Sequence, residues 1–367
     1  MTTTTTAAVL RVPEGRHEFE EITLGDLGPG DVLVRIVGAG LCHTDMLPRG
    51  MLAGVLPAVL GHEGSGIVVD VGPGVDRVRP GDPVVLSFAS CGSCRACESG
   101  HPAYCDAFFP LNLSARNLDG SGSAADSSNA PVGTRWFGQS SFARHAIVSE
   151  RSAVAVDKDL PLELMGPLGC GIQTGAGSVL NVMNVQPGQS VVVFGAGAVG
   201  LAGVMAARLA GAGEIIAVDL HQSRLDLAVE LGATRAVLAS TDDLSAAVLG
   251  DAAAVDHALD TTAVGSVMEL AITIVRPGGT VVFVGAGEQS ITVHPTQLTG
   301  KNVTYALEGD ADPQEFIPAL IEHWRAGQFP FDRLVTTFPF DEINTAEAES
   351  LSGAVIKPVL VFGPHAD

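Results

Sequence analysis

Positively charged residues are scarce in this chain, with 20 Lys and Arg against 41 Asp and Glu and a net charge of −21. A surface of that sign repels nucleic-acid phosphates and anionic lipid headgroups, which argues against both classes of partner. The sequence also lacks any run near the roughly 20 apolar residues that a membrane-spanning helix needs. Its first residues carry no basic segment of the kind that opens a signal peptide. We therefore expect a cytoplasmic protein that binds neither nucleic acid nor membrane.

Cysteine is rare too, with six in 367 residues, and four of them lie close together. Cys91, Cys94, Cys97 and Cys105 are spaced C-x2-C-x2-C-x7-C. Four thiolates so near in sequence can surround one metal tetrahedrally, which is the pattern of a closed structural zinc site. An iron–sulfur cluster is the alternative, but Asp106 stands where ferredoxin-type runs carry Pro. Zinc is therefore the favoured interpretation, and a disulfide framework is the least favoured, because the chain shows no sign of export.

The chain is too long for one ordinary core, and its pattern changes near residue 172. Residues 7–90 and 143–156 contain short β-type runs broken by Gly and Pro, whereas 112–134 are polar and predict a surface loop. Beyond residue 172, strands alternate with helices, which predicts a doubly wound parallel sheet in an α/β protein. The predicted strands there are 190–194, 214–219, 255–259, 280–284 and 355–362, and the predicted helices are 200–212, 224–231, 264–275 and 313–326.

A glycine-rich motif follows the predicted strand 190–194 and opens the next helix. Gly195 permits a tight turn, Gly197 lets a pyrophosphate approach the backbone, and Gly200 allows close packing of helix and sheet. Asp219 ends the second strand, nineteen residues beyond Gly200, where a carboxylate can accept hydrogen bonds from an adenosine ribose. Because its charge would repel a 2′-phosphate, we expect NAD rather than NADP.

A second group of metal-ligand types is dispersed along the chain. Cys42 and His62 each follow an apolar run, and a thiolate and an imidazole are ligands that zinc prefers. A catalytic zinc takes three protein ligands, and Cys170 is the one cysteine left outside the cluster. A lone Cys or His is ordinarily a buried core residue, so the interpretation as a metal site depends on the rest of the chain.

The order and spacing of these motifs resemble the zinc-dependent medium-chain alcohol dehydrogenase family over nearly the whole chain. The resemblance implies a GroES-like, β-rich catalytic domain over residues 1–171 and 310–367, with a structural zinc lobe at 91–105. It implies a Rossmann domain that binds NAD over residues 172–309, two Zn²⁺ per chain, and a small-molecule alcohol or aldehyde substrate. It also implies a homodimer or homotetramer joined at sheet edges, for which 302–307 beside 293–298 is the candidate edge.

The resemblance further assigns roles to individual residues. It implies that Cys42, His62 and Cys170 hold the catalytic zinc, that Glu63 stands behind the metal, and that Asp45 orients the imidazole of His62. The remaining implied roles are proton acceptance by Thr44, nicotinamide contact by Thr174 and Val199, adenosine contact by Arg224, and pyrophosphate contact by His43 and Lys357. For His43, Arg224 and Lys357, an ordinary solvated side chain is the competing interpretation. Leu47 departs from the pattern of many family members, which carry a His there that ends the proton relay.

Within the family, the chain most resembles the aryl-alcohol (benzyl-alcohol) dehydrogenases. The stretches that carry this resemblance are 137–143, 169–177, 308–310, 316–318, 329–335 and 356–360. We therefore expect reversible oxidation of an aromatic primary alcohol to its aldehyde. Terpenoid or aliphatic alcohols, a thiol–formaldehyde adduct, or a tightly held NAD that serves an external acceptor are alternatives. A non-catalytic NAD or redox sensor is the alternative of another class.

Overall fold

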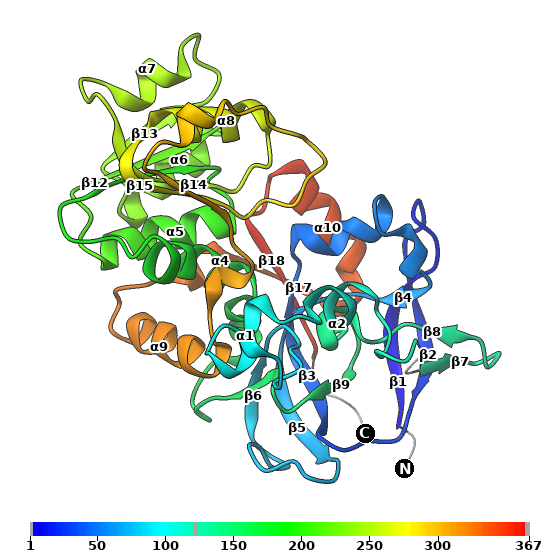
Figure 1. Cartoon of the computed structure of the whole chain (residues 1–367). Helices are drawn as coiled ribbons and strands as arrows, with labels where there is room; N and C mark the ends of the chain where they lie inside the picture. The colour runs from blue at the N-terminus through cyan, green and yellow to red at the C-terminus, as the bar shows by residue number, and fades with distance from the viewer. Residues whose placement is uncertain (1–2, 121–123, 364–367) are drawn as a thin grey trace. The chain divides into compact units, whose positions relative to one another are not determined.

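The computed structural model describes residues 3–120 and 124–363. The chain divides into two compact units (Figure 1). The first consists of the chain up to Cys170, Asp312–Pro318, and the chain from Asp332 onward; the second consists of Gly171–Ala311 and Ala319–Phe331. Among the described helices, none combines the length and the apolar character that crossing a bilayer requires.

Two sheets dominate the described part of the first unit. The smaller sheet has the order β4-β1-β2-β7-β8, with β1 at Thr3–Leu10, β2 at His17–Leu24, β4 at Ala58–Val59, β7 at Ala124–Asp126 and β8 at Pro131–Val132. The larger has the order β10-β6-β5-β3-β18-β17, with β9 paired to β3. Its strands are β3 at Asp31–Gly40, β5 at Glu63–Val71, β6 at Pro83–Leu86, β9 at His145–Ser149, β10 at Ala153–Ala155, β17 at Val335–Pro339 and β18 at Lys357–Val361.

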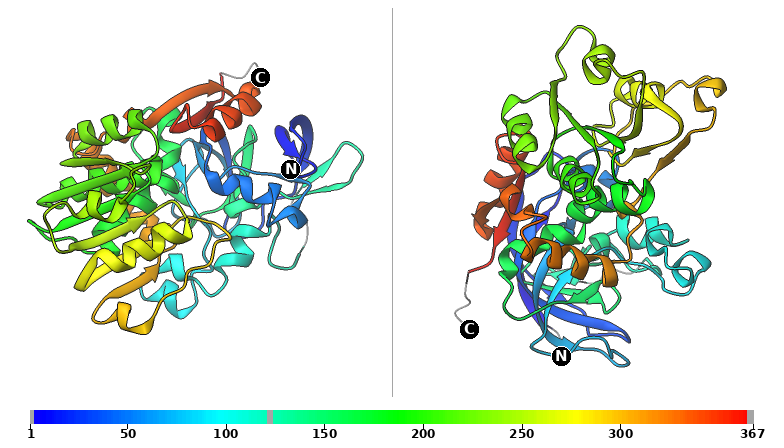
Figure 2. Two further views of the ribbon diagram at one scale, coloured as in Figure 1. Left: turned by 90° about the horizontal axis from the view of Figure 1, so that it is seen from above. Right: turned by 90° about the vertical axis from the view of Figure 1, so that its left-hand side faces the viewer.

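The C-terminal strand belongs to the same sheet as the N-terminal strands. β18, red in Figures 1 and 2, lies beside the blue strand β3 and pairs Leu360 with Ala39. Both strands are rich in buried aliphatic residues, so their pairing closes the core of this unit. This arrangement brings a segment from the end of the chain close to residues near its start.

The second unit is built on a six-stranded parallel sheet of order β13-β12-β11-β14-β15-β16. The strands are β11 at Ser190–Phe194, β12 at Glu214–Asp219, β13 at Arg235–Leu238, β14 at Val255–Asp260, β15 at Val275–Phe283 and β16 at Asn302–Tyr305. Counted along this unit, the order is 3-2-1-4-5-6, which is the doubly wound Rossmann order. The predicted fold class, a GroES-like β-rich domain with a Rossmann domain, is confirmed.

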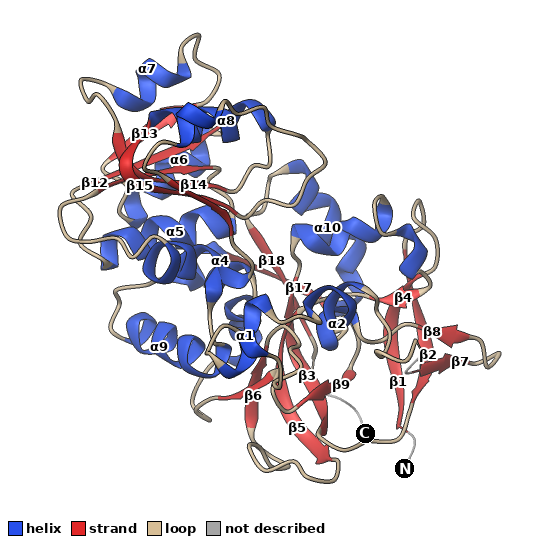
Figure 3. Ribbon diagram, in the orientation of Figure 1, coloured by secondary structure: helices blue, strands red, loops and turns tan. Residues whose placement is uncertain are grey.

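Helices cover both faces of the parallel sheet; Figure 3 shows α5 and α8 on opposite sides of its strands. Right-handed crossovers require this, because the chain leaves β11 in one direction and β14 in the other. The helices of this unit are α4 at Gly171–Gly177, α5 at Ala198–Leu209, α6 at Gln222–Leu231, α7 at Leu244–Leu249 and α8 at Gly265–Ile274. The first unit has α1 at Arg95–Glu98, α2 at Phe108–Leu113, α3 at Leu162–Met165 and α10 at Ile343–Ser352, and α9 at Pro313–Arg325 begins in the first unit and ends in the second.

Two expectations about local structure were wrong. The polar stretch 112–134 is not simply a loop: β7 pairs with β2, and Asp126 of β7 accepts a bond from Arg11 at 2.8 Å, which fixes the hairpin. Residues 121–123 of that stretch lie outside the described residues. The stretch 293–298 is not a strand beside β16: it contains a 3-10 helix from Pro295 to Leu298, because Pro295 lacks the N–H that a strand ladder needs. β16 pairs with β15 instead.

Candidate active site and metal centres

Two candidate ligands are brought together by one strand pair. β3 and β5 are antiparallel, and Gly40 at the end of β3 pairs with Glu63 at the start of β5. Cys42 lies just after the first strand and His62 just before the second. The ladder therefore places the thiol and the imidazole at the same edge of the sheet.

The third candidate ligand arrives on a loop that can approach this edge only because it carries glycine. A Cβ on Gly166 would lie 2.1 Å from the carbonyl oxygen of Glu63, and one on Gly169 would lie 1.9 Å from that of Leu86. The 3-10 helix Gly166–Gly169 therefore packs directly on β5 and β6 and ends at Cys170. As a result, the ligand atoms of Cys42, His62 and Cys170 all lie within 4.8 Å of one another.

Asp45 organises this edge from a fully buried position. Its Oδ1 accepts hydrogen bonds from His62 Nδ1 at 2.7 Å, Gly61 N at 3.1 Å and Trp136 Nε1 at 2.9 Å, and its Oδ2 accepts one from Cys42 N at 3.1 Å. Because Nδ1 donates to the carboxylate, the lone pair of the ring lies on Nε2. Within the described structure that Nε2 is buried and has no hydrogen-bond partner. A buried lone pair aimed toward two thiols fits a zinc ion, with Asp45 as its orienting carboxylate.

A buried ion pair lies beside the three ligands. Lys357 Nζ donates to both carboxylate oxygens of Glu63 at 2.8 Å and to the carbonyl oxygen of Leu41 at 3.0 Å. Burial raises the pKa of Glu63 to about 7, and Lys357 opposes the rise. The hydrogen bond from Cys170, assisted by the charge of Lys357, holds the pKa of the Cys42 thiol well below its usual value. A thiolate is the form that binds metal.

Lys357, for which the family pattern implies a pyrophosphate contact, is 3% exposed, and its ammonium is bound by Glu63 and Leu41. It therefore compensates the buried carboxylate of Glu63, and its contact with a cofactor stays a prediction. A carboxylate buried without such a partner would be strongly destabilised.

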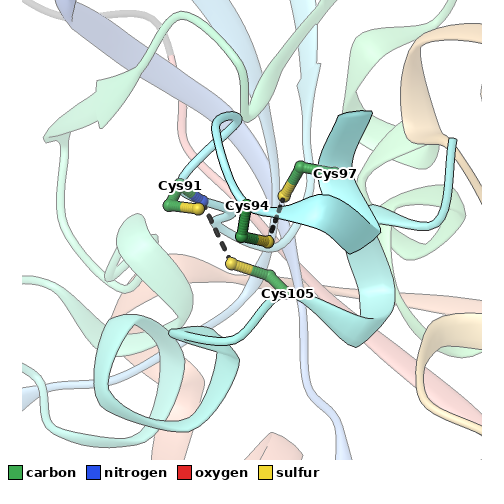
Figure 4. Close-up of side chains that lie close together, drawn as sticks. All are labelled: Cys91, Cys94, Cys97 and Cys105. Carbon is green, nitrogen blue, oxygen red and sulfur yellow. Dashed lines mark hydrogen bonds between the residues drawn. The ribbon is translucent and has the colours of Figure 1, made fainter. Parts of the chain in front are cut away.

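The cysteine-rich lobe has a second set of converging ligands. The sulfur atoms of Cys91, Cys94, Cys97 and Cys105 lie within 4.8 Å of one another. Figure 4 shows the four side chains close together in the lobe. The sulfur of Cys94 is 3.5 Å from that of Cys97, and backbone N–H groups of Cys91 and Ala107 donate to Cys105 Sγ at 3.3 and 3.4 Å. None of the six cysteines forms a disulfide. Four thiols with no vacancy for water match a closed, structural zinc site.

The glycine-rich turn of the second unit contains three glycines, and each position requires glycine for a different reason. Gly195 has a φ of +92°, and a Cβ on Gly200 would lie 1.7 Å from the Gly195 carbonyl oxygen, so both serve the fold. At Gly197, by contrast, no atom lies within 4 Å of the position of a Cβ. Gly197 caps the twelve-residue helix α5 without a side-chain cap. This open space at a free helix N-terminus fits a pyrophosphate.

Asp219 is hydrogen-bonded to that same turn. Its Oδ2 accepts from Ala196 N at 2.7 Å and its Oδ1 from His221 N at 2.8 Å. Arg224 Nη1 lies 3.9 Å from Asp219 Oδ2 and partly offsets the charge. The carboxylate therefore stands at a fixed place beside the turn.

Comparison with known proteins agrees with this geometry. A model of the alcohol dehydrogenase GroES-like domain matches residues 28–158, and one of the zinc-binding dehydrogenase domain matches residues 198–321. A geraniol dehydrogenase of Castellaniella defragrans is 47% identical over 363 residues, which cover 97% of each chain. This chain belongs to the zinc-dependent medium-chain alcohol dehydrogenase family.

Two solved structures of this family are also similar throughout. An alcohol dehydrogenase zinc-binding domain protein from Burkholderia ambifaria has a TM-score of 0.96 and 45% identity, covering 100% of both chains. A benzyl alcohol dehydrogenase from Acinetobacter calcoaceticus has a TM-score of 0.94 and 40% identity, covering 98% of this chain and 100% of the other. The resemblance seen in the sequence extends to the whole architecture of this alcohol dehydrogenase.

The other predicted site residues of the alcohol dehydrogenase take the following places. Thr44 Oγ1 is 3.9 Å from Cys42 Sγ, in the 3-10 helix that also contains Leu47, and His43 is exposed. Thr174, on α4, is 9% exposed. Val199 is half-buried in the first turn of α5, and a Cβ on Gly175 would lie 2.0 Å from its carbonyl oxygen. The helices that carry Thr174 and Val199 are therefore in direct contact.

Sequence reasoning missed the aromatic and amide support behind the imidazole. Phe137 stacks on the His62 ring with centroids 4.3 Å apart, although its own φ is +49°. Gln139 Nε2 donates to the His62 carbonyl at 2.9 Å, and Trp136 donates to Asp45. The stretch 137–143 resembles the aryl-alcohol subgroup, but no residue pattern in it indicates contact with a metal ligand.

Proposed function

We propose that this alcohol dehydrogenase oxidises primary alcohols to aldehydes reversibly, with NAD as the acceptor. The observation that carries the proposal is the convergence of Cys42, His62 and Cys170, with the Nε2 of His62 buried and unpartnered. Such a constellation is not needed by a non-catalytic sensor. Three protein ligands leave one position of a tetrahedral metal for the substrate.

Zinc held by these residues supplies a Lewis acid that lowers the pKa of an alcohol hydroxyl, and NAD at the glycine-rich turn supplies the hydride acceptor. The chain's own residues orient the ligands and handle the proton. Asp45 fixes the ring of His62. Thr44 offers its hydroxyl to the proton that leaves the alcohol. Because Leu47 has no proton acceptor, that proton passes to water or to the exposed His43.

The position of Asp219 supports NAD over NADP. Its carboxylate is held against the turn by Ala196, where it would repel a 2′-phosphate and accept bonds from a ribose. Arg224, 3.9 Å away, works in the opposite direction, so both cofactors belong in the test.

For the substrate, we propose aromatic primary alcohols, with terpenoid alcohols as the second candidate. Similar proteins named benzyl alcohol dehydrogenase and geraniol dehydrogenase support these two choices. Benzyl alcohol and geraniol share an unsaturated carbon next to the carbinol carbon, so oxidation of either yields a conjugated aldehyde. We further propose two zinc ions per chain, one in the cysteine lobe and one at the open site.

The test combines metal analysis with a substrate panel. Purified protein should contain two zincs and turn over benzyl alcohol with NAD at a higher kcat/KM than hexanol or the glutathione–formaldehyde adduct, with geraniol between or equal. Absorbance of the desalted protein shows whether NAD stays bound and serves an external acceptor. The variant Cys42→Ser should lose turnover yet bind NADH as the wild type does. Near-normal turnover of Cys42→Ser at low zinc, or inactivity of the zinc-loaded wild type on every alcohol and aldehyde, would overturn the proposal.

A further inference from the structure

A strained turn lies against α4 within the second unit. Its three residues all have positive φ, with 51° for Glu308, 66° for Gly309 and 50° for Asp310. Glycine adopts this left-handed region freely, but a residue with a Cβ is held there only when its surroundings impose the conformation. Two such residues flank the glycine here, and outliers of this kind cluster at functional sites.

The surroundings that impose the conformation are on the helical segment that begins with α4. Asn181 Nδ2 donates to the carbonyl oxygens of Gly309 and Asp310 at 3.2 and 3.3 Å. A Cβ on Gly177 would lie 2.4 Å from the Gly309 carbonyl oxygen, and a Cβ on Gly309 would lie 2.6 Å from that of Gln173. The turn and the helix are thus in backbone contact that no side chain could enter.

Glu308 adds a buried carboxylate to the strained backbone. Glu308 is 7% exposed, and its Oε2 accepts a hydrogen bond at 3.0 Å from Nε2 of the fully buried Gln173. Burying a carboxylate is costly even with a partner, and an apolar residue would avoid that cost. Neither the backbone conformation nor the burial favours Glu at this position for stability. The presence of Glu308 bonded to Gln173 is therefore better explained by the segment that this hydrogen bond holds in place.

The segment it holds carries a residue of the proposed site. Gln173 immediately precedes Thr174, and Cys170 stands three residues earlier in the chain. We infer that Glu308 is a positioning residue: through Gln173 it fixes the start of α4 and hence the place of Thr174 against the nicotinamide. The inference rests on the proposed function and on the contact of Thr174 with that ring, which the family resemblance implies. Since a misplacement of about 1 Å at reacting groups can cost on the order of 100-fold in rate, one fixed hydrogen bond here matters for turnover.

The experiment compares five variants in the zinc-loaded, full-length protein. Glu308→Ala should lower kcat on benzyl alcohol by roughly 10- to 100-fold and raise the Kd of NADH, measured by fluorescence, whereas Glu308→Gln keeps an acceptor for the Gln173 amide and should stay within a few-fold of wild type. Gln173→Ala should match Glu308→Ala. The double variant should lose no more than either single one, because both remove the same contact. Asp310→Asn removes a carboxylate from the same turn and should leave kcat unchanged.

The outcomes separate this inference from the proposed function. An active wild type with Glu308→Ala equal to it in kcat and NADH affinity overturns the positioning role alone, and so do fully multiplicative losses in the double variant. A wild type that neither binds NADH nor oxidises alcohols overturns the proposed function itself. If Glu308→Ala does not fold, the comparison of Glu308→Gln with Gln173→Ala decides, since equal activity of those two variants also overturns the role.

Discussion

Replacing Asp45 with Asn changes the support of the proposed catalytic zinc with little change in shape. The wild-type carboxylate accepts three hydrogen bonds at Oδ1 and one, from Cys42 N, at Oδ2. Asn keeps one acceptor oxygen. If that oxygen takes the place of Oδ1, the amide NH₂ faces the N–H of Cys42, and a buried donor is left unpaired at a cost of about 1–3 kcal/mol. Loss of the charge beside His62 should also lower metal affinity by about 10- to 100-fold.

Competition against a chromophoric chelator measures this effect directly. Wild type should show two tightly held zincs, and Asp45→Asn should show one unchanged and one weakened by 10- to 100-fold, because the cysteine lobe does not contact Asp45. Activity of the variant should recover in excess zinc. A matched control is Asp260→Asn, which makes the same chemical change at another fully buried carboxylate, one that binds Thr262 and Ala263 in the second unit. The control should keep both zinc affinities.

The reasoning fails on one result. If Asp45→Asn holds both zincs within about threefold of wild type while remaining folded, the carboxylate does not orient the ligand, and the unpartnered Nε2 of His62 needs another explanation.

Three further predictions follow from the geometry. Gly197→Ala should leave Tm unchanged but weaken NADH binding, since its Cβ faces open space. Gly200→Ala should lower Tm by roughly 2–4 °C per kcal/mol lost, because its Cβ would lie 1.7 Å from a carbonyl oxygen. Calorimetry in which Gly197→Ala lowers Tm more than Gly200→Ala does would contradict both predictions. Cys94→Ser should lose one zinc equivalent and lower Tm, and finding iron and sulfide in the wild type by elemental analysis would contradict the assignment. Burial raises the pKa of Glu347, but hydrogen bonds from His17 and Arg49 outweigh it and leave the pKa below its usual value; this stabilisation is present above about pH 4.3 and is lost as pH falls through the lowered pKa. Glu347→Gln should therefore flatten the acid limb of unfolding free energy against pH, and an unchanged limb would contradict it.

The parallel sheet could be predicted because its signals are local. Each strand is a short aliphatic run, and residues 190–194 and 214–219 coincide with β11 and β12. The glycine turn and Asp219 sit at strand ends, where the chain direction alone determines which edge they share. Neighbouring residues in sequence therefore sufficed to anticipate this unit.

The surroundings of the candidate metal site could not be predicted in the same way. Trp136 reaches Asp45 from 91 residues away, and Lys357 reaches Glu63 from 294 residues away. Such contacts depend on how sheets pair and pack, which no spacing within the sequence reveals. The family pattern implies a pyrophosphate contact for Lys357 but does not indicate its ion pair with Glu63, which neutralises a buried carboxylate.

The pairing of β3 with β5 determines where Cys42 lies relative to His62. The register of this pairing contains two irregularities, one between Leu33 and Val34 and one between Ile36 and Gly38. Removing one of the paired residues that follow, such as Ala39, would shift Gly40 and Cys42 by one position and turn the thiol to the opposite face. The segment between Leu47 and Pro57 lies outside the pairing of β3 with β5, so a change in its length does not shift the register of the two strands. Insertions and deletions, whether in natural relatives or in laboratory libraries, should therefore be tolerated between Leu47 and Pro57 and selected against in β3 and β5.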